Sequence, residues 1–235
     1  MRKMYRDQSI EEIYDGKFYG LNDLAKIGCD GCKGCSACCR GMGNSIILDP
    51  LDVHRLAAGL LCAPAALLQE HEEILPESGA RELCPARMEL GVADGLILPH
   101  LIMGGAEEKC TFLNEEGLCS VHAFRPGVCR LFPLGRFYDG GGDYTYIVQA
   151  GECSYPVKTK VKIKKWIDTP DYERYHCFVL KWHAFQKEKQ MQAAGMEAEA
   201  AKVLCIRILQ VFYLTPYPAD GFYEEFERRL NEFHV

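Results

Sequence analysis

The sequence predicts an α+β fold in which helices pack around a cysteine-rich centre, with short hairpins and a helical C-terminal third. Three observations support this fold class. Five cysteines fall within residues 29–39, pairs of apolar stretches flank tight turns in the middle of the chain, and apolar residues recur at helical spacing near its end. With 235 residues, 48% of them hydrophobic, the chain can bury a core. We expect a cysteine-cluster domain over residues 1–160, with a helical region over 161–235 packed on it.

The first quarter of the chain is expected to lead through a cysteine loop into a strand and a helix. A short helix and a turn are expected over residues 8–27, followed by the cysteine loop at 29–43. Residues 45–48, Ser-Ile-Ile-Leu, have the composition of a strand. Asp49 then supplies an N-cap and Pro50 the first helical position, so a helix is expected to begin here.

The middle of the chain is expected to alternate a helix with hairpins. A helix should begin after Ala63-Pro64 and run to about Ile74. The apolar stretches of residues 88–103 are split by Asp-Gly, a dipeptide that favours a hairpin turn. Residues 110–119 form a small knuckle with a turn at Asn114 to Gly117. A second hairpin is expected over residues 135–148 around the run Asp-Gly-Gly-Gly-Asp.

The last third is predicted to be helical after one strand. Lysines alternate with Thr, Val and Ile over residues 157–165, which is the period of a half-exposed strand. Thr169-Pro170 is expected to cap a helix. Its apolar positions include Tyr175, Phe178, Val179, Trp182 and Phe185. Gly195 separates this helix from a second one, and a Pro-containing break at 215–218 precedes a final amphipathic helix.

Composition and charge exclude several classes of protein. The net charge of −6 and the pI near 5.7 argue against nucleic-acid binding through a basic surface. No apolar run approaches the ~20 residues that span a bilayer, so no membrane association is expected. The charged N-terminus lacks the apolar stretch of a secretory signal. Thirteen cysteines without an export signal predict metal ligands and reduced thiols in the cytosol, where disulfides are rare.

The cysteines fall into two groups that are far apart in the sequence. The first group is spaced as repeated C-x-x-C steps and consists of Cys29, Cys32, Cys35, Cys38 and Cys39. The second group is Cys110, Cys119, Cys129 and Cys153. Thiolates that converge in this way bind zinc or an iron–sulfur cluster. We therefore predict that the chain binds metal through sulfur, at a site that the fold assembles.

The run Cys32-x-x-Cys35-x-x-Cys38-Cys39 resembles the signature of the bacterial CxxCxxCC cysteine-cluster family, whose members are described as zinc- or iron-chelating. The block from Cys110 to Pro133 is similar to that family's second motif, in which two cysteines precede Arg-Pro and then Cys-Arg with a following Pro. The resemblance covers roughly residues 29–155. It implies eight ligand positions, which are Cys32, Cys35, Cys38, Cys39, Cys110, Cys119, Cys129 and Cys153.

Three features depart from this family pattern. Cys29 adds another C-x-x-C step to the first motif. His122 stands where the family often has an aromatic residue, which gives Cys119-x-x-His122 and a further candidate ligand. A related cysteine-cluster domain occurs in flagellin lysine N-methylases, but those chains are much longer, and 235 residues leave little room for their extra region.

The number of sulfurs leaves several arrangements open. Eight thiolates suit two four-sulfur sites, either two 4Fe–4S clusters or two tetrahedral zinc sites, and a single cluster with four bystander cysteines is the alternative. Neighbouring side chains point in different directions, so Cys38 and Cys39 should serve different metals unless one of them is not a ligand. Zinc sites usually present two short paired knuckles. The scattered ligands therefore favour iron–sulfur over zinc.

The remaining candidates have structural explanations. Three cysteines in apolar surroundings are expected to be small core residues, namely Cys62, Cys177 and Cys205. Cys84 lies in a polar stretch, where a lone thiol is usually structural. Arg125 and Arg130 flank Cys129 and are placed to donate to cluster sulfides or loop carbonyls, or to pair with acids.

Three functions are compatible with this reading. The first is an iron–sulfur protein with a redox, electron-transfer or cluster-handling role. The second is an enzyme that uses such a centre, which by family analogy would be protein-modifying and similar to a lysine methylase. The third is a structural zinc module that presents its helical third to a partner. The sequence names neither the redox or protein partner nor a substrate, and no catalytic residue follows from it.

Overall fold

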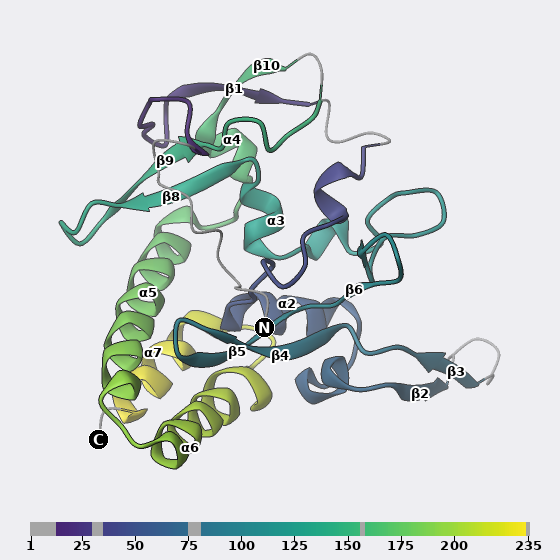
Figure 1. The fold of residues 1–235 in the computed structure, drawn as a ribbon, viewed down its shortest axis with the longest axis vertical. Coiled ribbons are helices and arrows are strands. Elements are labelled where there is room, and N and C mark those ends of the chain that lie inside the picture. The colour runs from purple at the N-terminus through teal and green to yellow at the C-terminus, as the bar shows by residue number, and fades with distance from the viewer. Residues whose placement is uncertain (1–12, 30–34, 75–80, 156–157, 234–235) are drawn as a thin grey trace.

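The structure is a computed structural model that describes residues 13–29, 35–74, 81–155 and 158–233. Within these residues the strands form two-stranded antiparallel pairs rather than one large sheet (Figure 1). The pairs are β1 (Leu24–Gly28) with β10 (Thr159–Lys162), β2 (His71–Ile74) with β3 (Arg81–Cys84), β4 (Met88–Ala93) with β5 (Leu96–Leu101), β6 (Met103–Gly104) with β7 (Lys109–Cys110), and β8 (Leu134–Tyr138) with β9 (Tyr144–Val148).

Along the chain, helices lie between these strand pairs and make up most of its last third. The α-helices are α2 (Pro50–Gly59), α3 (Gly127–Leu131), α4 (Ile163–Ile167), α5 (Tyr172–Ala194), α6 (Ala198–Ile208) and α7 (Phe222–Phe233). Shorter turns are the 3₁₀ helices η2 (Ala37–Cys39), η3 (Pro64–Leu68) and η4 (His122–Phe124) and the π-helical η5 (Leu209–Leu214). This mixture of helices and short antiparallel pairs confirms the predicted α+β class. The domain division after residue 160 stays a prediction.

The predicted hairpins form because their turns hold residues that tolerate positive φ. Between β4 and β5, Asp94 has φ +46° and Gly95 has φ +83°, so both central residues of the turn are left-handed. The pair β8–β9 turns through 139–143, where Gly140 and Gly142 are also left-handed. Side chains on one face of β5 pack into the core, including Leu96 and Leu98. The two hairpins therefore lie where the apolar pattern predicted them.

Three sequence predictions in the first half of the chain need correction. The expected helix from Ala63 to about Ile74 ends as η3 at Leu68, and residues 71–74 pair as β2 with β3 instead, because strand pairing satisfies their backbone groups. The short helix expected within residues 8–27 falls largely outside the described residues, and the expected turn is present at residues 21–22, but the segment ends in the strand β1, which was not predicted. The strand expected at 45–48 is reduced to a single bridge between Ile47 and His100.

The C-terminal helices pack through an aromatic core. Helix α5 begins at Tyr172 with Asp171, rather than Thr169, as its N-cap. The five apolar positions predicted for this helix are all buried. Trp182 stacks on Phe185 at 5.3 Å between ring centroids, and Phe178 meets Phe226 of α7 edge to face at 4.8 Å. These contacts join α5 to α7, and α6 packs against α5 and β5 (Figure 1).

Within the ranges given above, no helix combines the length and the apolar character that crossing a bilayer requires.

Candidate metal centre

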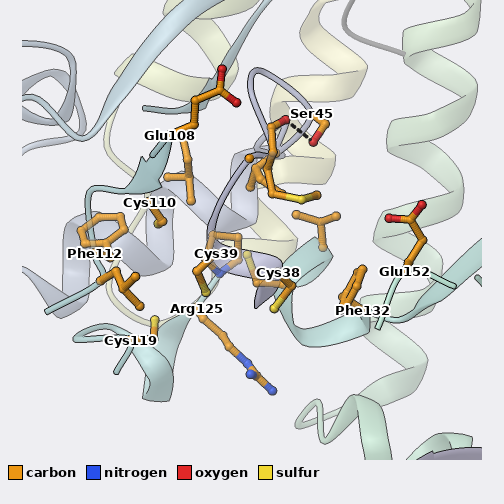
Figure 2. Close-up of a pocket in the computed structure, with 18 of the residues that line it drawn as sticks. Cys38, Cys39, Ser45, Glu108, Cys110, Phe112, Cys119, Arg125, Phe132 and Glu152 are labelled. Carbon is orange, nitrogen blue, oxygen red and sulfur yellow. Dashed lines mark hydrogen bonds between the residues drawn. The ribbon is translucent and has the colours of Figure 1, made fainter. Parts of the chain in front are cut away.

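Six of the predicted ligand cysteines line a single cavity of about 780 Å³. They are Cys35, Cys38, Cys39, Cys110, Cys119 and Cys129. Figure 2 shows Cys110 and Cys119 on one side of this pocket, with Phe132 and Glu152 on the opposite side. The first cysteine group and the second, separated by some seventy residues in the sequence, are therefore brought to one place by the fold.

The N-terminal cysteine loop is attached to the turn between β6 and β7. Cys38 and Cys39 lie on η2, and the next residue, Arg40, bridges to Lys109 of β7. The Gly41 N–H donates to the Glu108 carbonyl at 3.0 Å, and the Arg40 guanidinium pairs with Glu107. Backbone and ion-pair contacts together bring the two cysteines of η2 beside Cys110.

The knuckle between Cys110 and Cys119 is closed as the sequence predicted. Leu113 bridges to Cys119, and the Asn114 and Leu118 backbones are joined by a 2.9 Å hydrogen bond. The Asn114 side chain accepts a second bond from the Leu118 N–H at 2.8 Å. Gly117 takes the left-handed position of the turn at φ +75°. This tight loop fixes the separation of its two cysteines.

Two of the eight predicted ligands are not placed on the cavity wall. Cys32 lies outside the described residues. Cys153 is not among the residues that line the cavity, although its neighbour Glu152 is, and the Cys153 carbonyl accepts from Lys158 Nζ at 2.7 Å. Cys29 is 2% exposed and also lies off the wall. Cys84 is half-buried and does not line the cavity either.

The other cysteines follow the structural explanation in two cases out of three. Cys205 is buried, and the Ile97 N–H donates to its Sγ at 3.4 Å. Cys62 is half-buried and packs against the core. The prediction for Cys177 is wrong, because it lies on the exposed face of α5. Its neighbour Phe178 points into the core instead.

The two arginines beside Cys129 differ in what they contact. Arg125 lines the cavity and lies 3.1 Å from His122 Nε2, which is itself at the cavity rim and exposed. Arg130 donates to the carbonyls of Asp168 at 2.8 Å and Ala123 at 3.4 Å. Arg130 thus holds loop backbone, one of the roles predicted for it, whereas Arg125 places a positive charge near the sulfurs.

The sulfurs influence one another's ionisation. The Cys39 thiol donates a hydrogen bond to the Cys38 sulfur, which lowers the pKa of Cys38 to about 7. The same bond, together with burial, raises the pKa of Cys39. Burial also raises the pKa values of Cys110, Cys119 and Cys129, and neighbouring cysteine charges add to each shift. Adjacent Cys38 and Cys39 therefore influence each other's ionisation. That they serve different metals, unless one of them is not a ligand, stays a prediction.

The donor set fits a soft or borderline cation, although the sulfurs are not yet gathered at coordination distance. Among the described residues, no three His, Cys, Asp or Glu side chains form a group that could hold a metal ion in their present positions. The cavity nevertheless brings several thiols close together. Because neighbouring thiolates repel one another, ionising them together is unfavourable unless a positive charge lies among them. Rotation of cysteine side chains about the cavity is the movement that binding would require.

Metal affinity should fall as the pH is lowered. A thiol binds metal as the thiolate, so a cysteine whose pKa is raised must release a proton when metal binds. Proton binding then competes with the metal at every pH below that raised pKa. We expect the dissociation constant for zinc to rise about tenfold per released proton when the pH is lowered by one unit from 8 to 7. Competitive zinc titrations at the two pH values, with proton release recorded in weak buffer, measure this. A pH-independent constant would contradict thiolate ligation.

Sequence reasoning missed the apolar wall and the support of Cys129. The cavity is completed by side chains that carry no motif, including Met42, Phe112 and Phe132. Helix α3, which carries Cys129, is held at its first residue by the carboxylate of Asp52. The signal for Asp52 was its position three residues after the predicted N-cap Asp49, which is the spacing of a capping box.

Comparison with known proteins gives one match. Residues 31–168 match the model of the CxxCxxCC family, which is described as a putative zinc- or iron-chelating domain. Searches of curated proteins and of solved structures found no significant match. The matched region contains all six cysteines of the cavity wall and extends over more than half of the chain. On this match the protein is a metal-binding protein that belongs to the CxxCxxCC family.

Proposed function

We propose that the protein holds an iron–sulfur centre in the cysteine-lined cavity and uses it in a redox, electron-transfer or cluster-handling role. The observation that carries this proposal is the convergence of six cysteines, from four separate segments, on one cavity. The full proposed ligand set adds Cys32 and Cys153 to those six. Eight sulfurs in this set are enough for two 4Fe–4S clusters, and four of them are enough for one.

The choice of iron–sulfur over zinc rests on the number of sulfurs and on the size of the cavity. A tetrahedral zinc ion needs four ligands with sulfur at about 2.3 Å, so it occupies little space. Six cysteines around about 780 Å³ provide more sulfurs and more room than one such ion uses. The knuckle at Cys110 and Cys119 is the part that most resembles a zinc site, and its partners come from separate loops.

The chain's own residues would control the environment of this centre. An iron–sulfur cluster supplies one-electron redox chemistry whose potential depends on charge, hydrogen bonds to sulfur and solvent exposure. Apolar side chains such as Phe112 and Phe132 line the wall and limit the access of water. The hydrogen bond from Cys39 is the main cause of the lowered pKa of Cys38, and the charge of Arg125 adds to it. At Cys119, burial raises the pKa and the charge of Arg125 opposes that rise. A reducing compartment such as the cytoplasm suits these free thiols.

The cavity volume also favours a second candidate function. Pockets for small molecules usually enclose about 300–1,000 Å³ and are mostly apolar with a few polar groups. The cavity lies in this range and has Cys110 and Cys119 at one side with Phe132 and Glu152 at the other (Figure 2). An enzyme that binds a substrate beside its metal centre would use such a space.

Anaerobic purification followed by iron, zinc and acid-labile sulfide analysis tests the proposal. We expect iron and sulfide in equal amounts, at about four of each per cluster, with broad visible absorbance. Zinc without sulfide in a colourless protein would overturn the iron–sulfur proposal and favour the structural zinc module.

A further inference from the structure

We infer that Asp52 is a positioning residue for the metal centre, because its carboxylate holds helix α3 and thereby keeps Cys129 on the cavity wall. This inference rests on the proposed metal centre. Asp52 lies on α2 and is not itself among the cavity-lining residues. Its effect on the centre would therefore be exerted through the backbone that carries Cys129.

The contact between Asp52 and α3 is short and buried. Asp52 is 3% exposed, and its Oδ1 accepts a hydrogen bond from the Gly127 N–H at 2.6 Å. Gly127 is the first residue of α3, and Cys129 follows two residues later. The first N–H groups of a helix have no partner inside the helix. Asp52 supplies that partner across 75 residues of sequence.

The carboxylate is fixed from its own helix as well. Its second oxygen, Oδ2, accepts from the Asp49 N–H at 3.1 Å, and the Asp49 carboxylate accepts from the Asp52 N–H at 2.8 Å. This reciprocal capping box uses both carboxylates at the start of α2. Since both oxygens of Asp52 are engaged, the side chain has one orientation, and that orientation points at Gly127.

Gly127 is packed closely enough that a side chain here would require Tyr175 to shift. A Cβ atom at this position would lie 2.9 Å from Tyr175 Oη and 3.5 Å from Asp52 Oδ1. Tyr175 in turn accepts from Arg136 Nη2 at 2.7 Å. The start of α3 is thus clamped between α2 and the Tyr175–Arg136 pair. The position of Cys129 on the cavity wall is therefore fixed by the contacts at the start of α3.

Two substitutions separate the hydrogen bond from the charge. Asp52→Ala removes both the acceptor and the carboxylate. Asp52→Asn removes the charge but keeps one oxygen that can accept from the Gly127 N–H, while its NH2 group cannot accept from the Asp49 N–H and that capping bond is lost. A positioning role predicts that the alanine variant loses metal affinity while the asparagine variant recovers part of it. A purely electrostatic role predicts that the two variants behave alike.

Asp139→Ala is the matched control. Asp139 also accepts from a glycine N–H, that of Gly141 at 2.8 Å, but it does so in the exposed β8–β9 turn. It is not among the residues that line the cavity. Losing this bond removes the same kind of contact without touching α3.

The experiment combines cobalt(II) titration with amide hydrogen exchange on the purified full chain. Cobalt(II) reports thiolate ligation through its visible spectrum, whether the native metal is iron or zinc. We expect Asp52→Ala to weaken cobalt(II) binding about 10–100-fold, as is typical when a group that orients a metal ligand is removed. We expect Asp139→Ala to stay close to the wild type and Asp52→Asn to lose clearly less affinity than Asp52→Ala. Exchange in the α3 peptide should accelerate only in Asp52→Ala.

Each other outcome has a distinct meaning. Unchanged cobalt(II) affinity in Asp52→Ala, or equal losses in the alanine and asparagine variants, would overturn the positioning role. Accelerated exchange across β4 and β5 as well as α3 would mean that Asp52 supports the whole fold, which also overturns it. Absence of cobalt(II) binding by the wild type would instead refute the proposed metal centre itself.

Discussion

Replacing Cys129 or Cys110 with serine should lower the bound metal to about a tenth of the wild-type content or less. Both residues line the cavity, and they come from different elements, α3 and β7. A serine hydroxyl is a much poorer ligand for zinc or iron–sulfur than a thiolate. The measurement is metal per chain by elemental analysis after anaerobic purification.

Two cysteines provide controls for this experiment. Cys177→Ser changes an exposed thiol on α5, and Cys29→Ser changes a buried thiol that lies off the cavity wall. Both variants should keep nearly full metal content. Loss of a whole centre in Cys29→Ser would show that the first motif is a five-cysteine site. Metal loss in Cys177→Ser with retention in Cys129→Ser would place the site elsewhere.

Removing the metal should destabilise the whole chain, because the centre joins segments that are distant in sequence. A ligand that binds only the folded state at 100 times its dissociation constant adds about 2.7 kcal/mol to the free energy of unfolding. For a chain of this size that corresponds to a fall in Tm of roughly 5–11 °C after chelation. Thermal unfolding with and without chelator measures the shift, and in Cys110→Ser the chelator should have almost no effect.

The same account predicts that neither segment suffices alone. The η2 cysteines are held against β7 by the bridge from Arg40 to Lys109 and by the pairing of Arg40 with Glu107. A fragment that ends before Cys110 lacks both β7 and α3 and should hold no stoichiometric metal. Tight, complete metal binding by that fragment would contradict a site shared by the two segments.

Local signals in the sequence were sufficient for much of the fold. Asp94-Gly95 predicted its hairpin because the turn demands left-handed residues, and Asp49-Pro50 predicted the start of α2 because the cap chemistry is local. The helix expected to run to about Ile74 was wrong because pairing with β3, a tertiary contact, decides the conformation of residues 71–74. Cys177 was misplaced because successive side chains of a helix point about 100° apart, so the neighbour of a buried residue such as Phe178 can face solvent.

The spacing of the cysteines in the sequence predicted the part of the candidate site that consists of sulfur. The repeated cysteines predicted a convergence that six of them show at the cavity. The capping-box spacing from Asp49 marks Asp52 only as part of a helix start. Its contact with α3 could not be predicted, because the partner is a backbone N–H 75 residues away. The apolar residues of the cavity wall could not be predicted either, because in the sequence Phe132 cannot be told from an ordinary core residue.

X-ray absorption at the iron edge of the anaerobically purified protein tests the central claim most directly. The account predicts a first shell made of sulfur alone together with scattering from neighbouring iron atoms, as in a cluster held by cysteine thiolates. Both signals should be lost together in Cys129→Ser. A first shell of nitrogen and oxygen without iron neighbours, or a protein that carries no iron, would contradict it.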